Sequence, residues 1–199
     1  YQGYIEDSGG RLLALRKSGP ATLTMTGAST YSGGTTVSNG TLLVNNASGS
    51  GTGTGTLTVQ TGATLGGTGS IGGVATLESG STLAPGVSPG TLTFTAGMNL
   101  DAGSALDMEM GTSSDLISVT GGTLTGPPSG TVTITISDSG GLTDIDYTLI
   151  DWTGASVSDV DVSDFDLVIL DPNLRAGLSI QGSQLILSVS PLTSVFTFR

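Results

Sequence analysis

The 199-residue sequence contains neither histidine nor cysteine. Structural zinc, haem, iron–sulfur clusters, thiol catalysis and Ser-His-Asp triads therefore lose their usual ligands or nucleophiles. Charge is also scarce, because only 11% of residues are charged and five Lys and Arg stand against sixteen Asp and Glu. Nucleic acid is a poor partner for so few cations. No apolar run approaches the about 18 residues that a membrane-spanning helix requires.

What the sequence has in abundance is glycine, at 33 residues, together with Ser and Thr. Leu, Ile, Val and Phe still supply roughly a quarter of the chain, which is above the level typical of disordered proteins. The chain begins at Tyr1 without a methionine, and we interpret it as a processed or excised piece. We expect it to fold, with its stability coming from backbone hydrogen bonds and apolar packing rather than from disulfides.

The middle of the chain repeats an apolar residue, a glycine three positions later and a second apolar residue three positions after that. Examples run from Val37 through Gly40 to Leu43, and from Val59 through Gly62 to Leu65. Between the glycines, apolar residues alternate with threonine, which predicts short strands with one buried face. Each strand ends at a glycine, which permits a sharp turn.

Two architectures accommodate such strands: a parallel β-solenoid and an antiparallel sandwich. The solenoid fits better, because its core accepts small residues and its corners require glycine. We predict an all-β chain with an N-terminal lead or cap (1–20), a Gly/Thr-rich solenoid (21–137) and a less regular acidic β region (138–199). A capping or donated strand is expected at 192–198.

The N-terminal part resembles the autotransporter-associated β-strand repeat of bacterial secreted and surface proteins. The resemblance is carried by Lys17–Gly19, Thr22–Gly27, Ser29–Val37 and Gly40–Val44, with Ala21 and Ser29 as departures from the usual glycine and asparagine. Weaker similarity continues downstream, for example at Leu83–Leu92 and Tyr147–Trp152. The resemblance implies a right-handed parallel β-helix that is exported and displayed outside a bacterial cell. Proteins of this kind are adhesins, scaffolds and fibres more often than enzymes.

One pair of acids invites a catalytic interpretation. Asp107 and Glu109 alternate with Leu106, Met108 and Met110, so both carboxylates face one side of a strand about 7 Å apart, near glycosidase spacing. The plainer interpretation, which we favour, is a solvated face opposite a buried one.

A second group of acids lies near the C-terminus, at Asp159, Asp161, Asp164 and Asp166. The acids change parity across Ser163, which predicts a bulge or turn there. Four carboxylates near a turn are candidate calcium ligands, although their spacing is not that of a known calcium loop. The alternative, which we favour, is an acidic face that keeps the protein soluble and deters edge-to-edge aggregation. We expect no other cofactor.

The last residues are β-prone and uncharged until Arg199. They either cap their own solenoid or join a neighbouring molecule through Leu192, Val195, Phe196 and Phe198, giving a homo-oligomer or homopolymer. The sequence thus predicts a non-enzymatic extracellular structural protein, a subunit of a surface adhesin or filament. The alternative is a β-helix that binds or degrades polysaccharide. A surface glycan or host surface is a further expected partner, whereas nucleic acid and a membrane span are not expected.

Overall fold

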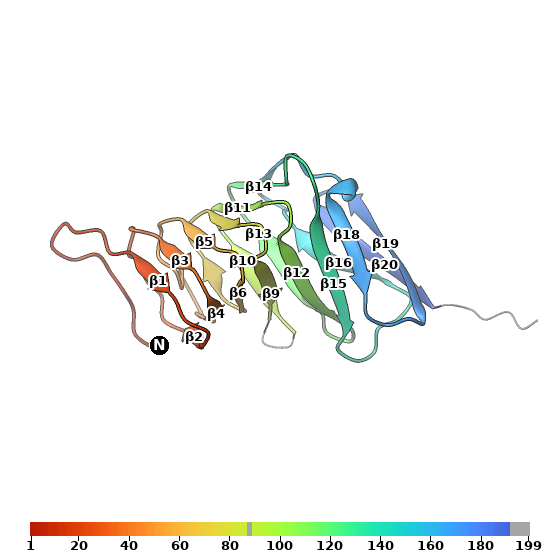
Figure 1. Ribbon diagram of the computed structural model, residues 1–199, viewed down its shortest axis with the longest axis horizontal. Coiled ribbons are helices and arrows are strands. Elements are labelled where there is room, and N and C mark those ends of the chain that lie inside the picture. The colour runs from red at the N-terminus through yellow and green to blue at the C-terminus, as the bar shows by residue number, and fades with distance from the viewer. Residues whose placement is uncertain (87–88, 192–199) are drawn as a thin grey trace, which may run out of the picture.

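The computed structural model describes residues 1–86 and 89–191 and has the architecture of a parallel β-solenoid (Figure 1). Three sheets run along the long axis, and neighbouring strands of a sheet come from successive coils of the chain. The predicted all-β, parallel fold class is confirmed. Within the described ranges, the one helical element is the 3-10 helix η1 (Val162–Asp164).

The three sheets are named here in the order in which the chain first enters them. Sheet 1 has the order β1 (Leu15–Lys17), β3 (Thr35–Val37), β5 (Leu57–Val59), β8 (Ala75–Leu77), β11 (Gly97–Leu100), β14 (Thr123–Thr125) and β17 (Ser156–Ser158). Sheet 2 has the order β2 (Thr22–Met25), β4 (Gly40–Val44), β6 (Ala63–Gly67), β9 (Thr82–Pro85), β12 (Ala105–Met110), β15 (Val132–Asp138) and β18 (Phe165–Ile169). Sheet 3 has the order β7 (Ser70–Ile71), β10 (Thr91–Phe94), β13 (Leu116–Val119), β16 (Asp146–Asp151), β20 (Gln184–Pro191) and β19 (Leu174–Gln181).

The core consists of apolar columns that run from coil to coil. In sheet 2 the parallel register stacks five fully buried side chains, namely Leu42, Leu65, Leu83, Leu106 and Ile134. Burial of each such side chain contributes about 1.5–3 kcal/mol before conformational entropy is subtracted. The alternating residues of the same strands point outward, as the period-two pattern predicts.

The first two corners between sheets 1 and 2, from β1 to β2 and from β3 to β4, show why glycine recurs in the sequence. Gly40 has a φ of 69° and lies against the carbonyl oxygens of Gly19 and Ala21. Lys17, which is in register with Val37, is only 6% exposed, and its ammonium donates to the carbonyl oxygens of Gly19 at 2.8 Å and Asn39 at 2.9 Å. The buried ammonium of Lys17 therefore finds its partners in the backbone of these two neighbouring corners.

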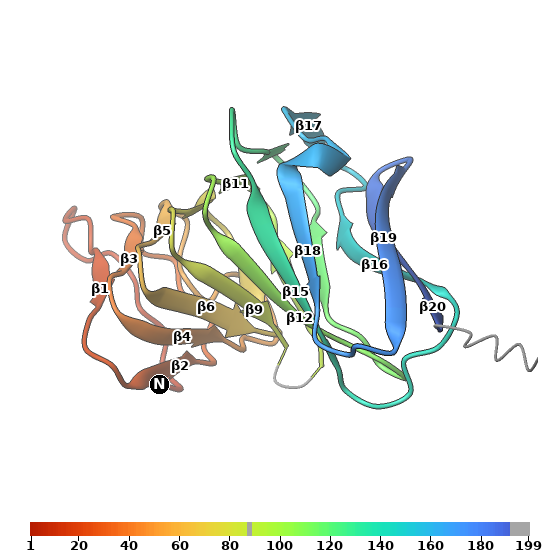
Figure 2. The same cartoon turned by 45° about the vertical axis from the view of Figure 1, so that its right-hand side comes forward.

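The coils grow longer toward the C-terminus. Along the sheet 2 column, the chain between Leu65 and Leu83 is the shortest coil and the chain between Ile134 and Leu167 is the longest. Figure 2 shows the solenoid broadening in that direction. The parallel ladders also extend beyond both predicted boundaries, because β1 precedes residue 21 and β17 and β18 follow residue 137.

Both ends of the solenoid carry additional chain. At the C-terminal end, β20 pairs antiparallel with β16 and with β19, so a hairpin extends sheet 3. At the N-terminal end, residues 1–14 lie on the first coil, where Thr26 N–H donates to Tyr1 O and Thr30 N–H donates to Ile5 O. The predicted contact residues Leu192, Val195, Phe196 and Phe198 lie outside the described residues.

Candidate functional site

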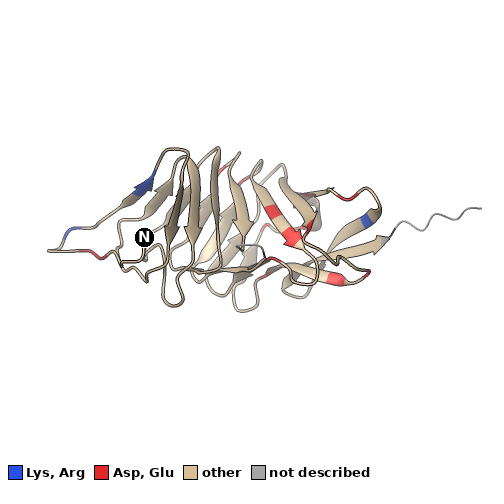
Figure 3. Ribbon diagram, turned by 90° about the horizontal axis from the view of Figure 1, so that it is seen from below, with Lys and Arg blue, Asp and Glu red and all other residues tan. Residues whose placement is uncertain are grey.

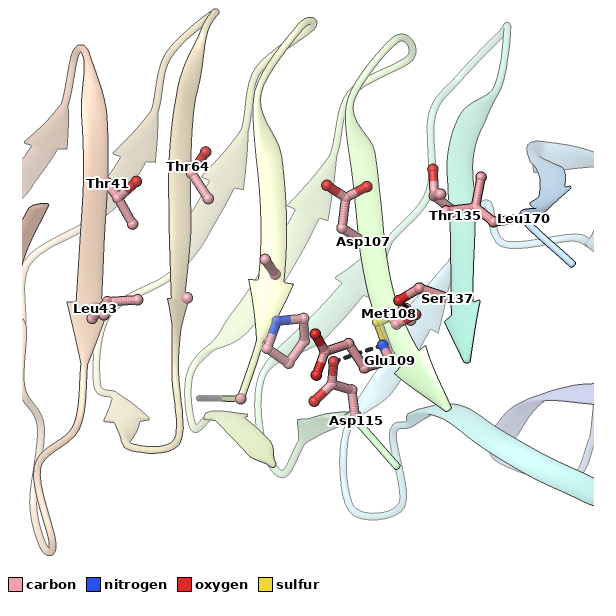
Figure 4. A pocket seen from close by; sticks show the side chains of 14 residues that line it. Thr41, Leu43, Thr64, Asp107, Met108, Glu109, Asp115, Thr135, Ser137 and Leu170 are labelled. Atoms are coloured by element: carbon pink, nitrogen blue, oxygen red, sulfur yellow. Dashed lines mark hydrogen bonds between the residues drawn. The ribbon is translucent and has the colours of Figure 1, made fainter. Parts of the chain in front are cut away.

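The outward face of sheet 2 contains a hollow of about 370 Å³ (Figure 4). It extends across β4, β6, β9, β12 and β15. Its wall and floor are formed by Thr41, Leu43, Thr64, Gly66, Ala84, Pro85, Thr135, Ser137 and Leu170, together with Asp107, Glu109 and Asp115.

The parallel register explains why the face is hollow. Leu43, Gly66 and Ala84 occupy one outward column, and Asp107 and Thr135 continue it in the next two coils. Gly66 and Ala84, the two smallest residues of the column, therefore lie between the longer side chains of Leu43 and Asp107. A side chain on Gly66 would meet the Ala84 carbonyl oxygen at 2.5 Å, so the floor at this position is backbone.

Strand β12 supplies two of the three carboxyl groups. Leu106, Met108 and Met110 are buried, whereas Asp107 is exposed and Glu109 is partly buried, which confirms the predicted two-faced strand. Glu109 Oε2 is enclosed and has no hydrogen-bond partner among the described residues. Glu109 is thus less solvated than the plain interpretation of an open polar face requires.

The third carboxyl group, Asp115, is one that the sequence analysis did not select. It precedes β13 and is 1% exposed. Its Oδ1 accepts from Gly90 N–H and its Oδ2 from Glu109 N–H, both at 2.8 Å. Burial raises the pKa of Asp115 above its ordinary value of 3.8, the two N–H donors oppose that rise, and the nearby Glu109 charge adds to it. The one feature of the sequence that marks Asp115 is its place directly before the alternating strand β13. Acidic residues are common at such loop positions, so this feature does not distinguish it.

The three carboxyl groups differ in what they can do. Asp115 has both oxygens engaged by backbone N–H groups, so it holds the segment around Gly90 against β12. Asp107 and Glu109 have no such engagement in the described residues and face the hollow (Figure 4). The site can accept hydrogen bonds from hydroxyl or cationic groups, and Asp115 acts as the residue that positions its rim.

The structure gives the four C-terminal acids separate local partners. Asp161 and Asp164 form a reciprocal capping box around η1, and Asp161 Oδ1 accepts from Ser163 N–H at 2.9 Å, which lowers the pKa of Asp161. Asp159 accepts from Ser158 Oγ, and Asp166 from Thr131 Oγ1. The predicted turn at Ser163 is this 3-10 turn. Across residues 1–86 and 89–191, no group of three or more acids is placed to hold a metal ion, and the calcium hypothesis gains no support from this arrangement.

The first coil carries the decisive likeness to known proteins. Lys17, the glycine corner at Gly40 and a fully buried Tyr31 all fall within β1 to β4. Residues 15–44 match the passenger-associated-transport-repeat family. The match confirms the resemblance to the autotransporter-associated repeat. No curated protein matches the chain.

Residues 15–44, which match the passenger-associated-transport repeat, enclose a buried tyrosine hydroxyl. Tyr31 Oη lies 2.5 Å from Thr35 Oγ1, and burial raises the pKa of Tyr31. Such repeats belong to the β-helical passenger domains of autotransporters, so the repeat indicates a bacterial protein that is secreted or displayed at the surface. Among the residues that the structure describes, no helix has the length and apolar character needed to cross a membrane.

Proposed function

We propose that the chain is a non-enzymatic extracellular structural protein, a stiff β-solenoid segment of a bacterial surface adhesin or filament. The observation that carries the proposal is the combination of a passenger-associated-transport repeat with apolar columns that continue through successive coils. Each coil supports only its neighbours, so stiffness grows by repetition and needs no cofactor.

The composition supports the same role. A low content of charge, with the acids gathered in the C-terminal half, leaves long parallel ladders to provide the cohesion. Between Lys17 and Arg175 the sequence has no Lys or Arg, so a trypsin-like protease finds no cleavage site there. A protein exposed outside the cell benefits from both properties.

The experiment places the chain between a secretion signal and an outer-membrane translocator in a Gram-negative host. Antibody staining of intact cells and survival under externally added proteinase K are measured. The expected result is surface display of a protease-resistant rod. The control is Leu83→Asp, which places a charge in the central apolar column and should abolish the resistance. A chain that remains inside the cell, or that is degraded as fast as the control, would contradict the proposal.

A second candidate function is binding or processing of a polysaccharide, and the hollow on sheet 2 favours it. Its wall offers Asp107 and Glu109 beside threonine and serine hydroxyls, which suits the hydroxyl groups of a sugar. A glycan array, followed by hydrolysis assays on each bound glycan, tests this candidate. Asp107→Asn should abolish any activity found, and Asp144→Asn, an exposed acid in the loop before β16, should leave it unchanged.

A further inference from the structure

The hollow on sheet 2 is elongated along the direction in which the coils stack (Figure 4). It crosses the five neighbouring strands β4, β6, β9, β12 and β15, so at a strand spacing of about 4.8 Å it extends over about 19 Å. Leu43 lies toward one end and Leu170 toward the other. The same outward positions recur in every coil, so the hollow presents a repeating surface whose shape suits a linear polymer.

The floor of the hollow is apolar and one of its sides carries hydroxyl groups. Gly66 and Ala84 form the floor, and Thr41 and Thr64, which are in register on successive coils, stand along one side. Ligand sites typically combine an apolar lining with a few placed polar groups in this way. A sugar ring packs the face formed by its C–H bonds on such a floor and directs its hydroxyl groups to the sides.

The charge of the hollow is of one sign. In the described part of the chain, all ionisable side chains that line it are carboxyl groups, namely Asp107, Glu109 and Asp115. The sequence has no Lys or Arg between Lys17 and Arg175, so the strands that form the hollow supply no counter-ion. A ligand that complements this surface brings positive charge to it, because a cationic donor and a carboxylate form the stronger, charge-assisted hydrogen bonds.

Two of the carboxyl groups are placed to receive such a donor. Asp107 is exposed and follows Ala84 in the outward column, and Glu109 is partly buried two residues further along β12, about 7 Å away. Glu109 Oε2 has no hydrogen-bond partner among the described residues. Asp115 has both oxygens engaged by backbone N–H groups and serves to position β12. A donor between Asp107 and Glu109 therefore meets carboxyl oxygens that the described fold leaves without a partner.

We propose that the hollow binds a linear polysaccharide of amino sugars. The protonated amine of one sugar donates hydrogen bonds to Asp107 and Glu109, while the neighbouring rings lie along the coils over Ala84 and Gly66. A neutral sugar leaves both carboxylates without a charged donor, and an acidic sugar is repelled by them, so the same two residues bind one class and reject another. The inference rests on the second candidate function, the binding of polysaccharide, and names its ligand class.

The test is isothermal titration calorimetry of the full chain with three hexasaccharides, composed of glucosamine, N-acetylglucosamine and galacturonic acid. The first two share one backbone and differ in whether the amine carries a charge. Because the whole chain has a net charge of −11, any polycation is attracted to it, and the variants must remove equal charge at different places. Asp107→Asn is therefore compared with Glu78→Gln, an acid that directly follows β8 in sheet 1.

A second pair of variants tests the floor. Ala84→Leu fills the middle of the hollow, whereas Ala105→Leu makes the same change at a partly buried position of β12 that does not line the hollow. Circular dichroism verifies that each variant is folded.

The expected result is saturable binding of the glucosamine hexasaccharide that weakens as salt is added, with no binding of the galacturonic acid hexasaccharide. Affinity should fall about ten-fold in Asp107→Asn and in Ala84→Leu and stay unchanged in Glu78→Gln and Ala105→Leu. If the N-acetylated hexasaccharide binds as tightly as the charged one, the ligand class is wrong while polysaccharide binding stands. Equal losses in Asp107→Asn and Glu78→Gln would show general attraction without a site, and a chain that binds none of the three sugars overturns both the inference and the candidate function beneath it.

Discussion

Replacement of Gly40 by alanine tests the physical basis of the glycine corners. Gly40 and Gly62 occupy the same corner of successive coils: Gly40 is the first residue of β4, and Gly62 directly precedes β6. Both have a positive φ, of 69° and 78° respectively. Their surroundings differ. A Cβ on Gly40 would lie 2.5 Å from Gly19 O, 2.7 Å from Ala21 O and 2.8 Å from Lys17 Nζ, whereas a Cβ on Gly62 meets nothing within 4 Å.

The magnitudes follow from this difference. Both substitutions incur the cost of a left-handed backbone at a residue with a side chain, about 1–2 kcal/mol. Gly40→Ala must also displace the backbone carbonyl groups of Gly19 and Ala21, and the Gly19 oxygen accepts a hydrogen bond from the Lys17 ammonium. We expect at least about 1–3 kcal/mol more from this overpacking and from the disturbed hydrogen bonds of a buried charge. Gly40→Ala should therefore be the more destabilising variant by a clear margin.

The assay must report on the first coil, because a solenoid can open at its end while the remainder stays folded. Trypsin provides this report, since Arg16 and Lys17 lie in β1. The rate of cleavage after these residues should rise strongly in Gly40→Ala and little in Gly62→Ala, and urea unfolding followed by circular dichroism gives the global free energy. Equal cleavage rates and equal unfolding free energies for the two variants would refute the steric explanation.

Leu65→Ala and Leu83→Ala should each lower the free energy of unfolding in urea by about 2–5 kcal/mol. The double variant should lower the free energy of unfolding by about 0.5–1 kcal/mol less than the two single effects added together, because each single variant already removes the Leu65–Leu83 contact. Two effects that add exactly would contradict this register. Because the pKa of Asp115 is raised in the folded state, the native protein binds its proton more tightly, so stability should fall as pH rises from 3.8 through the raised pKa. Asp115→Asn should flatten this slope in urea titrations at several pH values, whatever its effect on absolute stability, and unchanged slopes would show that Asp115 is not the source. Trypsin digestion of the wild type should leave a large fragment that begins after the exposed Arg11, because Arg16 and Lys17 lie in the β1 ladder, and mass spectrometry showing prompt cleavage at Arg175 would instead indicate that β19 opens easily.

Much of the fold could be predicted from the sequence because it depends on neighbouring residues. The alternation of Leu106, Met108 and Met110 with Asp107 and Glu109 fixes which side of β12 is buried, and the structure confirms it. A glycine such as Gly40 marks a corner because only a residue without a side chain fits the positive φ and the close carbonyl groups. The repeat within residues 15–44 was identifiable for the same reason, since its residues contact one another within one coil and the next.

Other features depended on which residues the coils bring together. Asp115 bonds Gly90 and Glu109 only because β10, β12 and β13 meet at one edge, and its local sequence contains no sign of this. The hollow on sheet 2 likewise arises from the register that places Gly66 and Ala84 between Leu43 and Asp107, residues of four different coils.

The ends of the solenoid also separate what the sequence determines from what the tertiary structure determines. The sequence by itself determined short strands, glycine corners and an acidic final region, because hydrophobic period and turn chemistry act over a few residues. Only the tertiary structure decided that β20 would turn back antiparallel on β16 and that the column from Leu15 would end at a half-exposed Val157. Strand direction and the point at which a stack of coils stops are set by long-range pairing, for which the alternation within a single strand carries no information.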